Sequence, residues 1–294
     1  MSSRKKFTLR LCSGKLVLGE RTLVMGVLNV TPDSFSDGGK FFDAGRAVEK
    51  ALAMERGGAD LLDIGGESTR PGSAGISAQE ELARVLPVLQ ALRGRLKIPV
   101  SIDTQKTEVA EAALDAGAQI INDISGLKSD PRIAEVAARR RVPLILMHMR
   151  GEPRTMQAAA FARDVMKDVL QGLHKSVATA RKASVAKSQI ILDPGIGFGK
   201  SFAQNYELLQ KLPQLAKLGF PLLVGTSRKG FLGATLAQEG KSAPPEERIW
   251  GTAATVTASI LNGAHIVRVH DVSEMVQVAR VADCVLDPKQ RPQN

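Results

Sequence analysis

The chain has 294 residues, of which 44% are hydrophobic and 24% charged, and its net charge is +10. This length suits a single α/β barrel, and an aromatic content of 4% argues against a protein that stacks nucleic-acid bases on its rings. The positive charge has two interpretations, a solvated basic surface or the steering of anionic ligands. Because Lys and Arg cluster only at residues 4–6 and 139–141, no nucleic-acid partner is expected.

The two cysteines, Cys12 and Cys284, lie far apart and form no CxxC pair, so neither a zinc site nor a disulfide framework is predicted. The first residues contain no apolar signal core, and no apolar run approaches membrane-spanning length. We therefore expect a cytoplasmic protein with no membrane partner.

The first predicted element is a β-hairpin over residues 7–20, where polar and apolar residues alternate and the chain turns at Ser13-Gly14. Eight short runs follow that are apolar nearly throughout, which is typical of strands buried on both faces. These runs cover residues 22–30, 59–66, 99–104, 119–125, 143–149, 189–195, 221–227 and 265–271.

Helical patterns alternate with the apolar runs and cover residues 43–58, 77–94, 107–118, 130–141, 161–183, 203–219, 246–264 and 273–286. Asp43 is the expected N-cap of the first helix. Ser77 and Glu80 have the spacing of a capping box. Pro87 and Pro213 fall inside two patterns, where they are expected to kink or cap the helix.

Eight alternations of strand and helix predict an α/β fold of the (β/α)8 barrel type, with the hairpin at the bottom of the barrel. We expect one domain over residues 1–294, a long polar connection over 237–247 and a tail from residue 285. An open doubly wound sheet is the structural alternative. The count of eight and the lack of GxGxxG after the first strand disfavour it.

Polar residues mark the carboxyl ends of all eight predicted strands. They are Asn29, Asp63, Asp103, Asn122, Asp123, His148, Asp193, Ser227, Arg228, Lys229, Arg268, His270 and Asp271. A carboxylate beside a hydrophobic strand is costly unless it is paired or reaches water. Any one of them could cap a helix, but in a barrel all these ends converge on one face. The set therefore predicts a single polar pocket.

The residue types in this pocket indicate the chemistry of its ligand. Carboxylates and carboxamides suit a planar heterocycle that presents parallel N–H donors. The cations Arg70, Lys229 and Arg268, together with His270, suit a phosphate or a carboxylate. Asn29 and nearby Asp residues could hold a divalent ion such as Mg²⁺ on a diphosphate.

Seven sequence blocks resemble those of the dihydropteroate synthase family in order and spacing. The blocks are NVTPDSFSDGG (29–39), LDIGGESTRPG (62–72), SIDT (101–104), INDISG (121–126), LDPGIGFGK (192–200), GTSRKGFLG (225–233) and VRVHDV (267–272). The resemblance runs from about residue 22 to residue 284. It implies a barrel that joins 6-hydroxymethyl-7,8-dihydropterin diphosphate to 4-aminobenzoate, releases pyrophosphate and makes 7,8-dihydropteroate.

The resemblance also implies a role for each matching residue. The pterin pocket would be formed by Asp103, Asn122, Met147, Asp193, Phe198, Lys229 and Arg268. Asp193 would accept the 2-amino and N3 hydrogens of the ring, Lys229 would reach its carbonyl and N5 side, and Arg268 would stack on its face. The diphosphate would be bound by Asn29, Thr69, Arg70, Arg268 and His270, and Mg²⁺ by Asn29 and Asp37.

The 4-aminobenzoate site implied by the resemblance comprises Phe35, Thr69, Pro71, Ser227, Lys229 and Gly230. Its loops after the first and second strands are lids that close over the ligands. The family mechanism is SN1-like, with Asp103, Asp193, Lys229, Arg268 and His270 as the catalytic residues. The family is usually a homodimer, and sulfonamides mimic its aminobenzoate substrate.

This sequence departs from the family at Gly230, where many members carry a serine expected to help bind the aminobenzoate carboxylate. Backbone N–H groups of the next helix could serve instead. Two alternative functions remain: a pterin-binding methyltransferase that uses a methylated folate, and a pterin-binding barrel without turnover. The SRKG block, the TPDSFSDGG loop and the VRVHD pair disfavour the methyltransferase.

Overall fold

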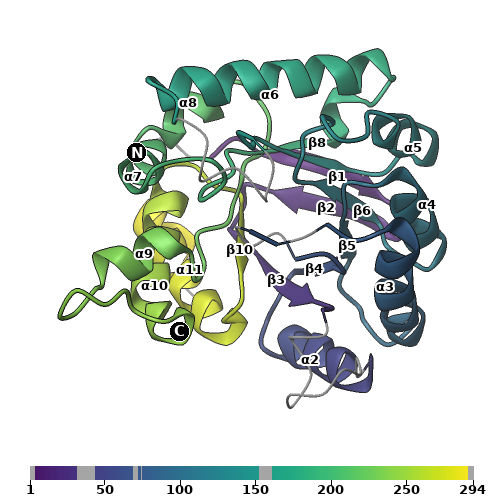
Figure 1. The fold of residues 1–294 in the computed structure, drawn as a ribbon, viewed down its shortest axis with the longest axis horizontal. Helices are drawn as coiled ribbons and strands as arrows, with labels where there is room; N and C mark the ends of the chain where they lie inside the picture. The colour runs from purple at the N-terminus through teal and green to yellow at the C-terminus, as the bar shows by residue number, and fades with distance from the viewer. Residues whose placement is uncertain (1–3, 32–43, 69–71, 74, 152–160, 291–294) are drawn as a thin grey trace.

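The computed structural model describes residues 4–31, 44–68, 72–73, 75–151 and 161–290. Its central sheet contains eight parallel strands in the order β8-β7-β6-β5-β4-β3-β10-β9. A parallel bridge between Leu192 and Leu222 brings the two ends of this order together. The predicted barrel is therefore confirmed, and the open sheet is excluded (Figure 1). The strands are β3 (Leu23–Asn29), β4 (Leu61–Gly65), β5 (Val100–Asp103), β6 (Ile120–Asp123), β7 (Leu144–Met147), β8 (Ile190–Asp193), β9 (Leu223–Val224) and β10 (Ile266–Val269).

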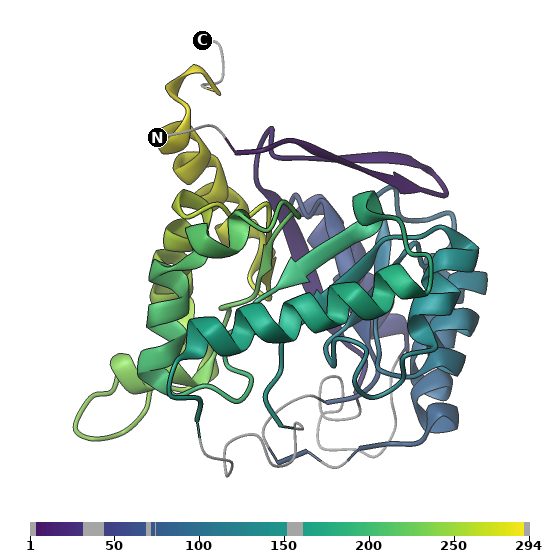
Figure 2. The same cartoon turned by 90° about the horizontal axis from the view of Figure 1, so that it is seen from above.

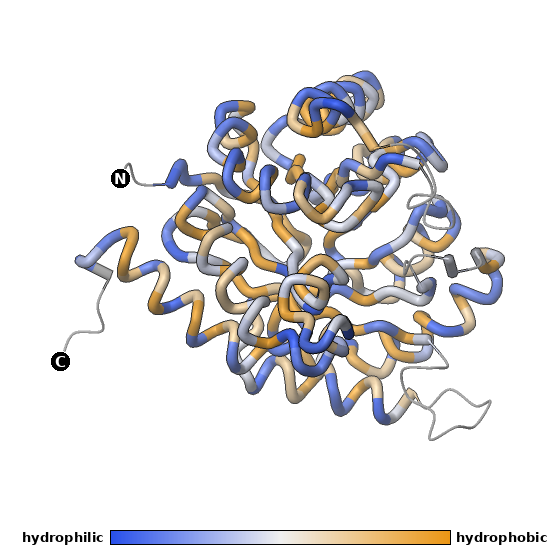
Figure 3. Tube along the Cα trace, turned by 60° about the vertical axis from the view of Figure 1, so that its left-hand side comes forward, coloured by the Kyte–Doolittle hydropathy of each residue, from blue (hydrophilic) through white to orange (hydrophobic). Residues whose placement is uncertain are grey.

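Helices form the outer layer around the strands. They are α2 (Ala44–Arg56), α3 (Ala78–Leu92), α4 (Thr107–Asp115), α5 (Ile133–Arg140), α6 (Val165–Lys182), α7 (Phe202–Gln210), α8 (Leu212–Ala216), α9 (Gly230–Thr235), α10 (Ile249–Leu261) and α11 (Val272–Leu286). Along the outer helices the trace alternates between hydrophilic and hydrophobic residues (Figure 3), as expected of helices with one face on a core and one in water. Within the described ranges, no helix is long and apolar enough to cross a membrane.

Local sequence signals explain several helix boundaries. At the start of α3, Ser77 N donates to Glu80 Oε2 at 2.8 Å and Glu80 N donates to Ser77 Oγ at 3.2 Å, so the predicted capping box is confirmed. Pro213 separates α7 from α8 and occupies the first turn of α8, where a missing N–H costs nothing. Pro87 lies inside α3 without ending it. Asp43 lies outside the described residues.

The connection after β9 contains more structure than the sequence predicted. The short helix α9 precedes the expected polar segment 237–247, and a bridge pairs Gln238 with Lys241 inside that segment. The 3-10 helix η2 (Pro245–Arg248) then leads into α10. At the other end of the chain, α11 continues to Leu286 and the 3-10 helix η3 (Pro288–Gln290) follows it, within the tail expected from residue 285.

The hairpin formed by β1 (Phe7–Leu11) and β2 (Gly14–Leu18) lies across one end of the barrel (Figure 2). Leu9 and Leu18 are fully buried and pack on residues inside the barrel at the first positions of the strands, such as Leu61. Gln189 fixes the hairpin by bonding both the N–H and the carbonyl of Arg10 at 2.8 Å. The predicted plug at the bottom of the barrel is confirmed.

Candidate active site

The carboxyl end of the barrel holds a hydrogen-bonded cluster of four strand residues. Arg268 on β10 donates from Nε to Asp63 Oδ2 at 2.7 Å and from Nη2 to Asp103 Oδ2 at 2.9 Å. Asn122 Nδ2 donates to the same Asp63 oxygen at 2.9 Å. The sheet register places Gly65 next to Asp103 and Asp103 next to Asn122. Parallel pairing thus brings together side chains that are distant in the sequence.

Two buried acceptors of this cluster, Asp63 Oδ1 and Asn122 Oδ1, receive no hydrogen bond from the part of the chain that the structure describes. Asp63 is fully buried and Asn122 is 2% exposed. An unsatisfied buried polar atom costs about 1–3 kcal/mol. Because both atoms are acceptors, the group that would complete this cluster is a hydrogen-bond donor.

The carboxylate charge in the cluster exceeds the guanidinium charge that faces it. Burial, and after it the Asp63 carboxylate, raise the pKa of Asp103 to about 8, whereas Arg268 lowers it. One guanidinium therefore serves two buried carboxylates. When Asp103 is ionised, the cluster carries one more negative than positive charge, which suits a ligand on which positive charge develops.

Asp193 ends β8 and lies opposite Met147 in the sheet. Its Oδ1 accepts a hydrogen bond from Gly195 N at 2.7 Å. Burial raises the pKa of Asp193 to about 6, while the Gly195 N–H and the charges of Lys229 and Arg268 lower it. The same cations therefore act on Asp193 and Asp103, and the two carboxylates belong to one electrostatic site.

An apolar wall adjoins Asp193. It consists of Ile124, Met147, Met149 and Phe198. The Lys229 ammonium lies 4.1 Å from the centre of the Phe198 ring, within the range of a cation–π contact. Burial, and after it Arg268, lower the pKa of Lys229 to about 8. An aromatic ring, a methionine and a buried cation next to a carboxylate form a slot that suits a flat polar heterocycle.

His270 and Ser227 form a second polar group, at the ends of β10 and β9. Ser227 Oγ accepts from His270 N at 3.2 Å and lies 3.0 Å from His270 Nδ1. Burial, and after it Arg268, lower the pKa of His270 to about 3. The imidazole is therefore neutral at physiological pH, and it can bind an anion through an N–H donor but not as a permanent cation.

Asn29 ends β3 in the same row of the sheet as the cluster, because it lies opposite Gly65. Among the described residues, no group of three or more His, Cys, Asp and Glu side chains could hold a metal ion. A Mg²⁺ ion in this region would therefore take most of its ligands from the substrate and water, as Mg²⁺ often does with diphosphates. The single amide oxygen of Asn29 fits that donor set.

The structure brings together most of the site residues named from the sequence. Asp103, Asn122 and Arg268 belong to one hydrogen-bonded cluster, the charges of Lys229 and Arg268 act on Asp193, and Met147 and Phe198 lie in the apolar wall that Lys229 contacts. That these residues form one ligand site stays a prediction. Five residues lie outside the described ranges, namely Phe35, Asp37, Thr69, Arg70 and Pro71. Gly230 begins α9, and a Cβ on it would meet no atom within 4 Å.

Two residues in the site had no predicted role. Asp63 was recognised only as a polar strand end, yet it contacts both Arg268 and Asn122. The signal for this role in the sequence was the position of Asp63 in a strand that was predicted to be buried on both faces. Lys200 is buried next to the Phe198 backbone. Nothing in the sequence marks this lysine, because its surroundings come from two separate loops.

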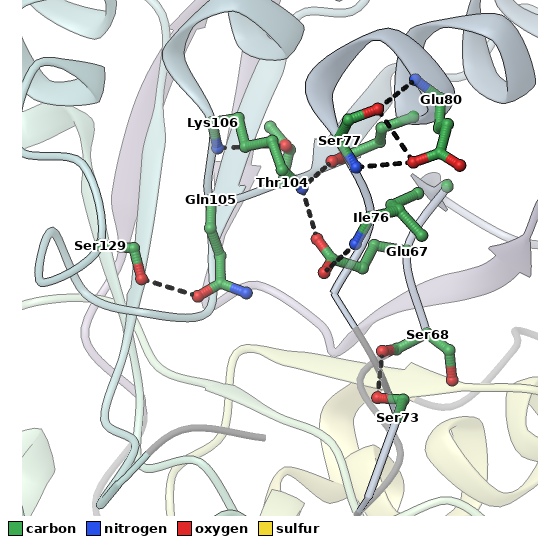
Figure 4. Close-up of polar contacts among 12 residues, drawn as sticks. Glu67, Ser68, Ser73, Ile76, Ser77, Glu80, Thr104, Gln105, Lys106 and Ser129 are labelled. Carbon is green, nitrogen blue, oxygen red and sulfur yellow. Dashed lines mark hydrogen bonds and ion pairs between the residues drawn. The ribbon is translucent and has the colours of Figure 1, made fainter. Parts of the chain in front are cut away.

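A further polar cluster supports the connection from β4 to α3 (Figure 4). Lys106 Nζ donates to Glu67 Oε2 and Glu81 Oε2, both at 2.6 Å, and Glu67 Oε1 accepts from Ile76 N at 3.3 Å. A cavity of about 480 Å³ adjoins this cluster and is lined by Glu67, Gly75, Ile76, Gln105, Lys106, Glu108, Ser129, Asp130 and Arg132. Glu67 thereby ties together the two ends of the connection that contains Thr69, Arg70 and Pro71.

Comparison with known proteins identifies the class to which this barrel and site belong. A family model described as pterin binding enzyme matches residues 25–270. A dihydropteroate synthase from Synechocystis is 53% identical over 91% of both chains. The structure of a Clostridium difficile dihydropteroate synthase, determined in the presence of pteroic acid, has a TM-score of 0.84 at 43% identity and covers 91% of this chain and 98% of its own. A Yersinia pestis dihydropteroate synthase in complex with a sulfonamide drug has a TM-score of 0.87 at 43% identity, with 95% and 99% covered.

These matches define the chain as a member of the pterin-binding enzymes, and within them it belongs to the dihydropteroate synthase family of transferases. The resemblance found in the seven sequence blocks is confirmed. The similarity extends over the whole barrel, and so includes every strand that supplies a residue to the site.

Proposed function

We propose that the chain condenses 6-hydroxymethyl-7,8-dihydropterin diphosphate with 4-aminobenzoate to give 7,8-dihydropteroate and pyrophosphate. The observation that carries this proposal is the pair of unsatisfied buried acceptors, Asp63 Oδ1 and Asn122 Oδ1, beside the carboxylate of Asp193. A pterin ring presents N–H donors along one edge, and such donors would satisfy these oxygens. The family membership supports the same substrate.

In the proposed complex the Asp193 carboxylate accepts the 2-amino and N3 hydrogens of the pterin, a paired contact that requires the ionised form. Asn122 Oδ1 accepts a further ring hydrogen. Lys229 donates to the carbonyl and N5 side of the ring, Arg268 stacks on one face, and Met147 and Phe198 form the apolar wall. Each of these side chains is already held by the sheet or by a neighbour, so little ordering is needed on binding.

In this proposal the diphosphate lies toward Asn29, Arg268 and His270. Thr69 and Arg70 complete its binding site. Asn29 would hold a Mg²⁺ ion together with Asp37. When bound, Mg²⁺ would neutralise charge on the leaving diphosphate. Neutral His270 donates an N–H to a phosphate oxygen, and Ser227 fixes the orientation of its ring.

The reaction proceeds in the proposal by an SN1-like course. The bond between the pterin methylene and the diphosphate oxygen breaks first, and the ring nitrogen supplies electrons to the cationic methylene. The excess negative charge of Asp63, Asp103 and Asp193 stabilises this cation. The 4-aminobenzoate nitrogen then attacks the methylene and loses one proton, so the product is neutral at the new C–N bond.

The aminobenzoate is expected near Ser227, Lys229 and Gly230, with Phe35, Thr69 and Pro71 from the two connections. The open space at Gly230 lies where other members place a serine. This space is consistent with a carboxylate bound by backbone N–H groups and water instead of by a hydroxyl.

We further propose that the chain is a homodimer that associates through α7, α10 and α11. Helix α10 packs on both α7 and α11, and the three helices expose large apolar side chains, including Trp250 at 79% and Val281 at 66%. Several such side chains on adjacent helices are unusual for a monomer. Light scattering in solution measures the mass, and a monomer would contradict the proposal.

Mixing the two substrates with the protein and Mg²⁺ tests the reaction. The proposal expects pyrophosphate and 7,8-dihydropteroate in equal amounts. If the protein instead released no pyrophosphate and transferred a methyl group from a methylated folate, the methyltransferase alternative would be correct.

A further inference from the structure

Lys200 is buried behind the apolar wall, with 7% of its surface exposed. Its ammonium group has three acceptors within reach: Phe198 O at 2.9 Å, His148 O at 3.2 Å and His148 Nδ1 at 3.2 Å. An ammonium group has three N–H donors and no acceptor. The surroundings of Lys200 therefore match the charged form, with one acceptor for each hydrogen.

These contacts join the two loops that form one side of the pterin pocket. Lys200 and Phe198 lie on the loop after β8, and His148 lies on the loop after β7. The backbones already touch, because His148 N donates to Asp193 O at 2.9 Å and a Cβ on Gly195 would clash with the His148 carbonyl. The ammonium thus fastens the carbonyl of Phe198 to His148, whose backbone N–H in turn bonds the Asp193 carbonyl.

The charged groups around Lys200 are of both signs. The carboxylates of Asp193 and Asp168 favour its charged form, and the cations Lys128 and Lys229 oppose it. His148 is neutral, because burial and after it Lys200 lower its pKa to about 2. Burial lowers the pKa of Lys200 itself to about 7. In the other direction, burial raises the pKa of Asp193, and the Gly195 N–H, the charges of Lys229 and Arg268 and, after them, the charge of Lys200 lower it.

We propose that Lys200 is a positioning residue of the pterin pocket, which keeps the Asp193 carboxylate ionised and holds the Phe198 wall in place. This inference rests on the proposed function, because it gives Asp193 the task of accepting pterin hydrogens. Lys229 and Arg268 also face Asp193, but both are assigned to the ligand. The hydrogen bonds of Lys200 are made to Phe198 and His148, so while Lys200 is protonated its charge lies behind the pocket whether or not a pterin is bound.

The test is the pH dependence of pteroic acid binding, measured by calorimetry between about pH 5 and about pH 8. In the wild type the affinity is high above the pKa of Asp193, about 6, and falls as the pH decreases. In Lys200→Met the pKa of Asp193 rises, so the loss of affinity begins at a higher pH. At about pH 7 we expect binding about tenfold weaker, from the lost charge and the looser wall. Toward about pH 8 part of that loss recovers.

Lys128→Met is the matched control. Lys128 is exposed and donates to Met149 O at 2.5 Å on the loop after β7, so its loss removes one charge and one loop contact nearby. It is not among the cations that act on Asp193. Its pH profile should match that of the wild type. A purely structural role of Lys200 would weaken binding equally at every pH.

Lys200→Gln is the second variant, since it keeps donors for the carbonyls without the charge, and circular dichroism reports whether each variant folds. It should show the same displaced pH profile as Lys200→Met. If either folded variant retains the wild-type midpoint, the inference is overturned. If the wild type itself does not bind pteroic acid, the proposed function fails instead, and the two failures are distinguishable.

Discussion

Asp63 is the residue on which the geometry of the candidate site depends most. It is fully buried, accepts hydrogen bonds from Arg268 and Asn122 through one oxygen, and has a second oxygen that receives no hydrogen bond from the described residues. Asp63→Asn keeps the shape but removes the charge that orients Arg268. We expect kcat/KM to fall at least about tenfold, because hydrogen bonds to charged groups contribute about 1.5–3 kcal/mol each.

The control for Asp63 is its neighbour Asp60, which pairs with Arg21 at the surface and accepts from Val24 N at 2.8 Å. Asp60→Asn changes the same residue type just before β4, the strand that carries Asp63, but lies outside the site. Its kcat/KM, measured by pyrophosphate release, should stay within about twofold of the wild type. Equal losses in both variants would contradict the role given to Asp63.

The two raised carboxyl pKa values predict how activity depends on pH. The pKa of Asp193 is raised to about 6 and that of Asp103 to about 8, in both cases mainly by burial. Both residues act in the ionised form, so the rate should increase with pH through this range and decrease on acidification. The measured midpoints belong to the coupled cluster and not to single residues. A rate that stays constant from about pH 5 to about pH 8 would contradict this account.

Gly230→Ser is a substitution that we expect to improve the binding of 4-aminobenzoate. Its φ is not positive and a Cβ would meet nothing within 4 Å, so Gly230→Ser should be tolerated with a stability change of about 0.5 kcal/mol or less. The added hydroxyl could donate to the carboxylate of the substrate, so we expect the KM for 4-aminobenzoate to fall. The KM for the pterin diphosphate serves as the internal control and should not change. A higher KM for 4-aminobenzoate would place its carboxylate elsewhere.

Residues at strand ends were predictable because their polarity contradicts the burial of the strands that carry them. Asp103, Asn122 and Asp193 stand out in apolar runs for this reason. The pairing of Arg268 with Asp63 was not predictable, since it depends on which side chains meet across the barrel. Lys200 gave no signal, because a lysine that follows a glycine-rich loop is usually solvated.

Among the elements, the long amphipathic helices and the strand count could be predicted, whereas short elements could not. Helix α9 has six residues and begins at a glycine, so no periodicity can build up over its length. Strand β9 pairs over only two residues, although the predicted strand covered residues 221–227. In both cases backbone hydrogen bonds set by the neighbouring elements decide the boundary.

We expect the hairpin to contribute to the stability of the fold and not to catalysis. Leu9 is fully buried against the interior of the barrel, at the end away from the site. Leu9→Ala should lower the free energy of unfolding by about 2–5 kcal/mol, through lost burial and the cavity that remains. Val17, on the exposed side of the same hairpin, provides the matched control Val17→Ala.

Denaturant unfolding measures both hairpin variants, and pyrophosphate release measures their activity. The folded Leu9→Ala variant should keep its kcat, and Val17→Ala should change neither quantity appreciably. A loss of kcat in folded Leu9→Ala would show that the two ends of the barrel are coupled.

The residues that close the barrel with an apolar core and the residues of the candidate site lie at opposite ends of the barrel axis. The hairpin lies across one end (Figure 2) and closes it with apolar side chains. The other end carries carboxylates, cations and unsatisfied acceptors. Barrels generally place their active sites at the carboxyl ends of the strands. This division explains why an excess of buried negative charge can persist: the core beneath it and the outer helix layer do not depend on it.

The central claim is that the unsatisfied acceptors Asp63 Oδ1 and Asn122 Oδ1 form the pterin site together with the Asp193 carboxylate. A crystal structure of the protein with pteroic acid tests it most directly. We expect the 2-amino and N3 hydrogens of the pterin on the Asp193 carboxylate, another ring hydrogen on Asn122 Oδ1, and the ring between Arg268 and the Met147–Phe198 wall. A ligand held elsewhere, for instance in the cavity beside Lys106, with Asp193 and Asn122 untouched, would contradict the account.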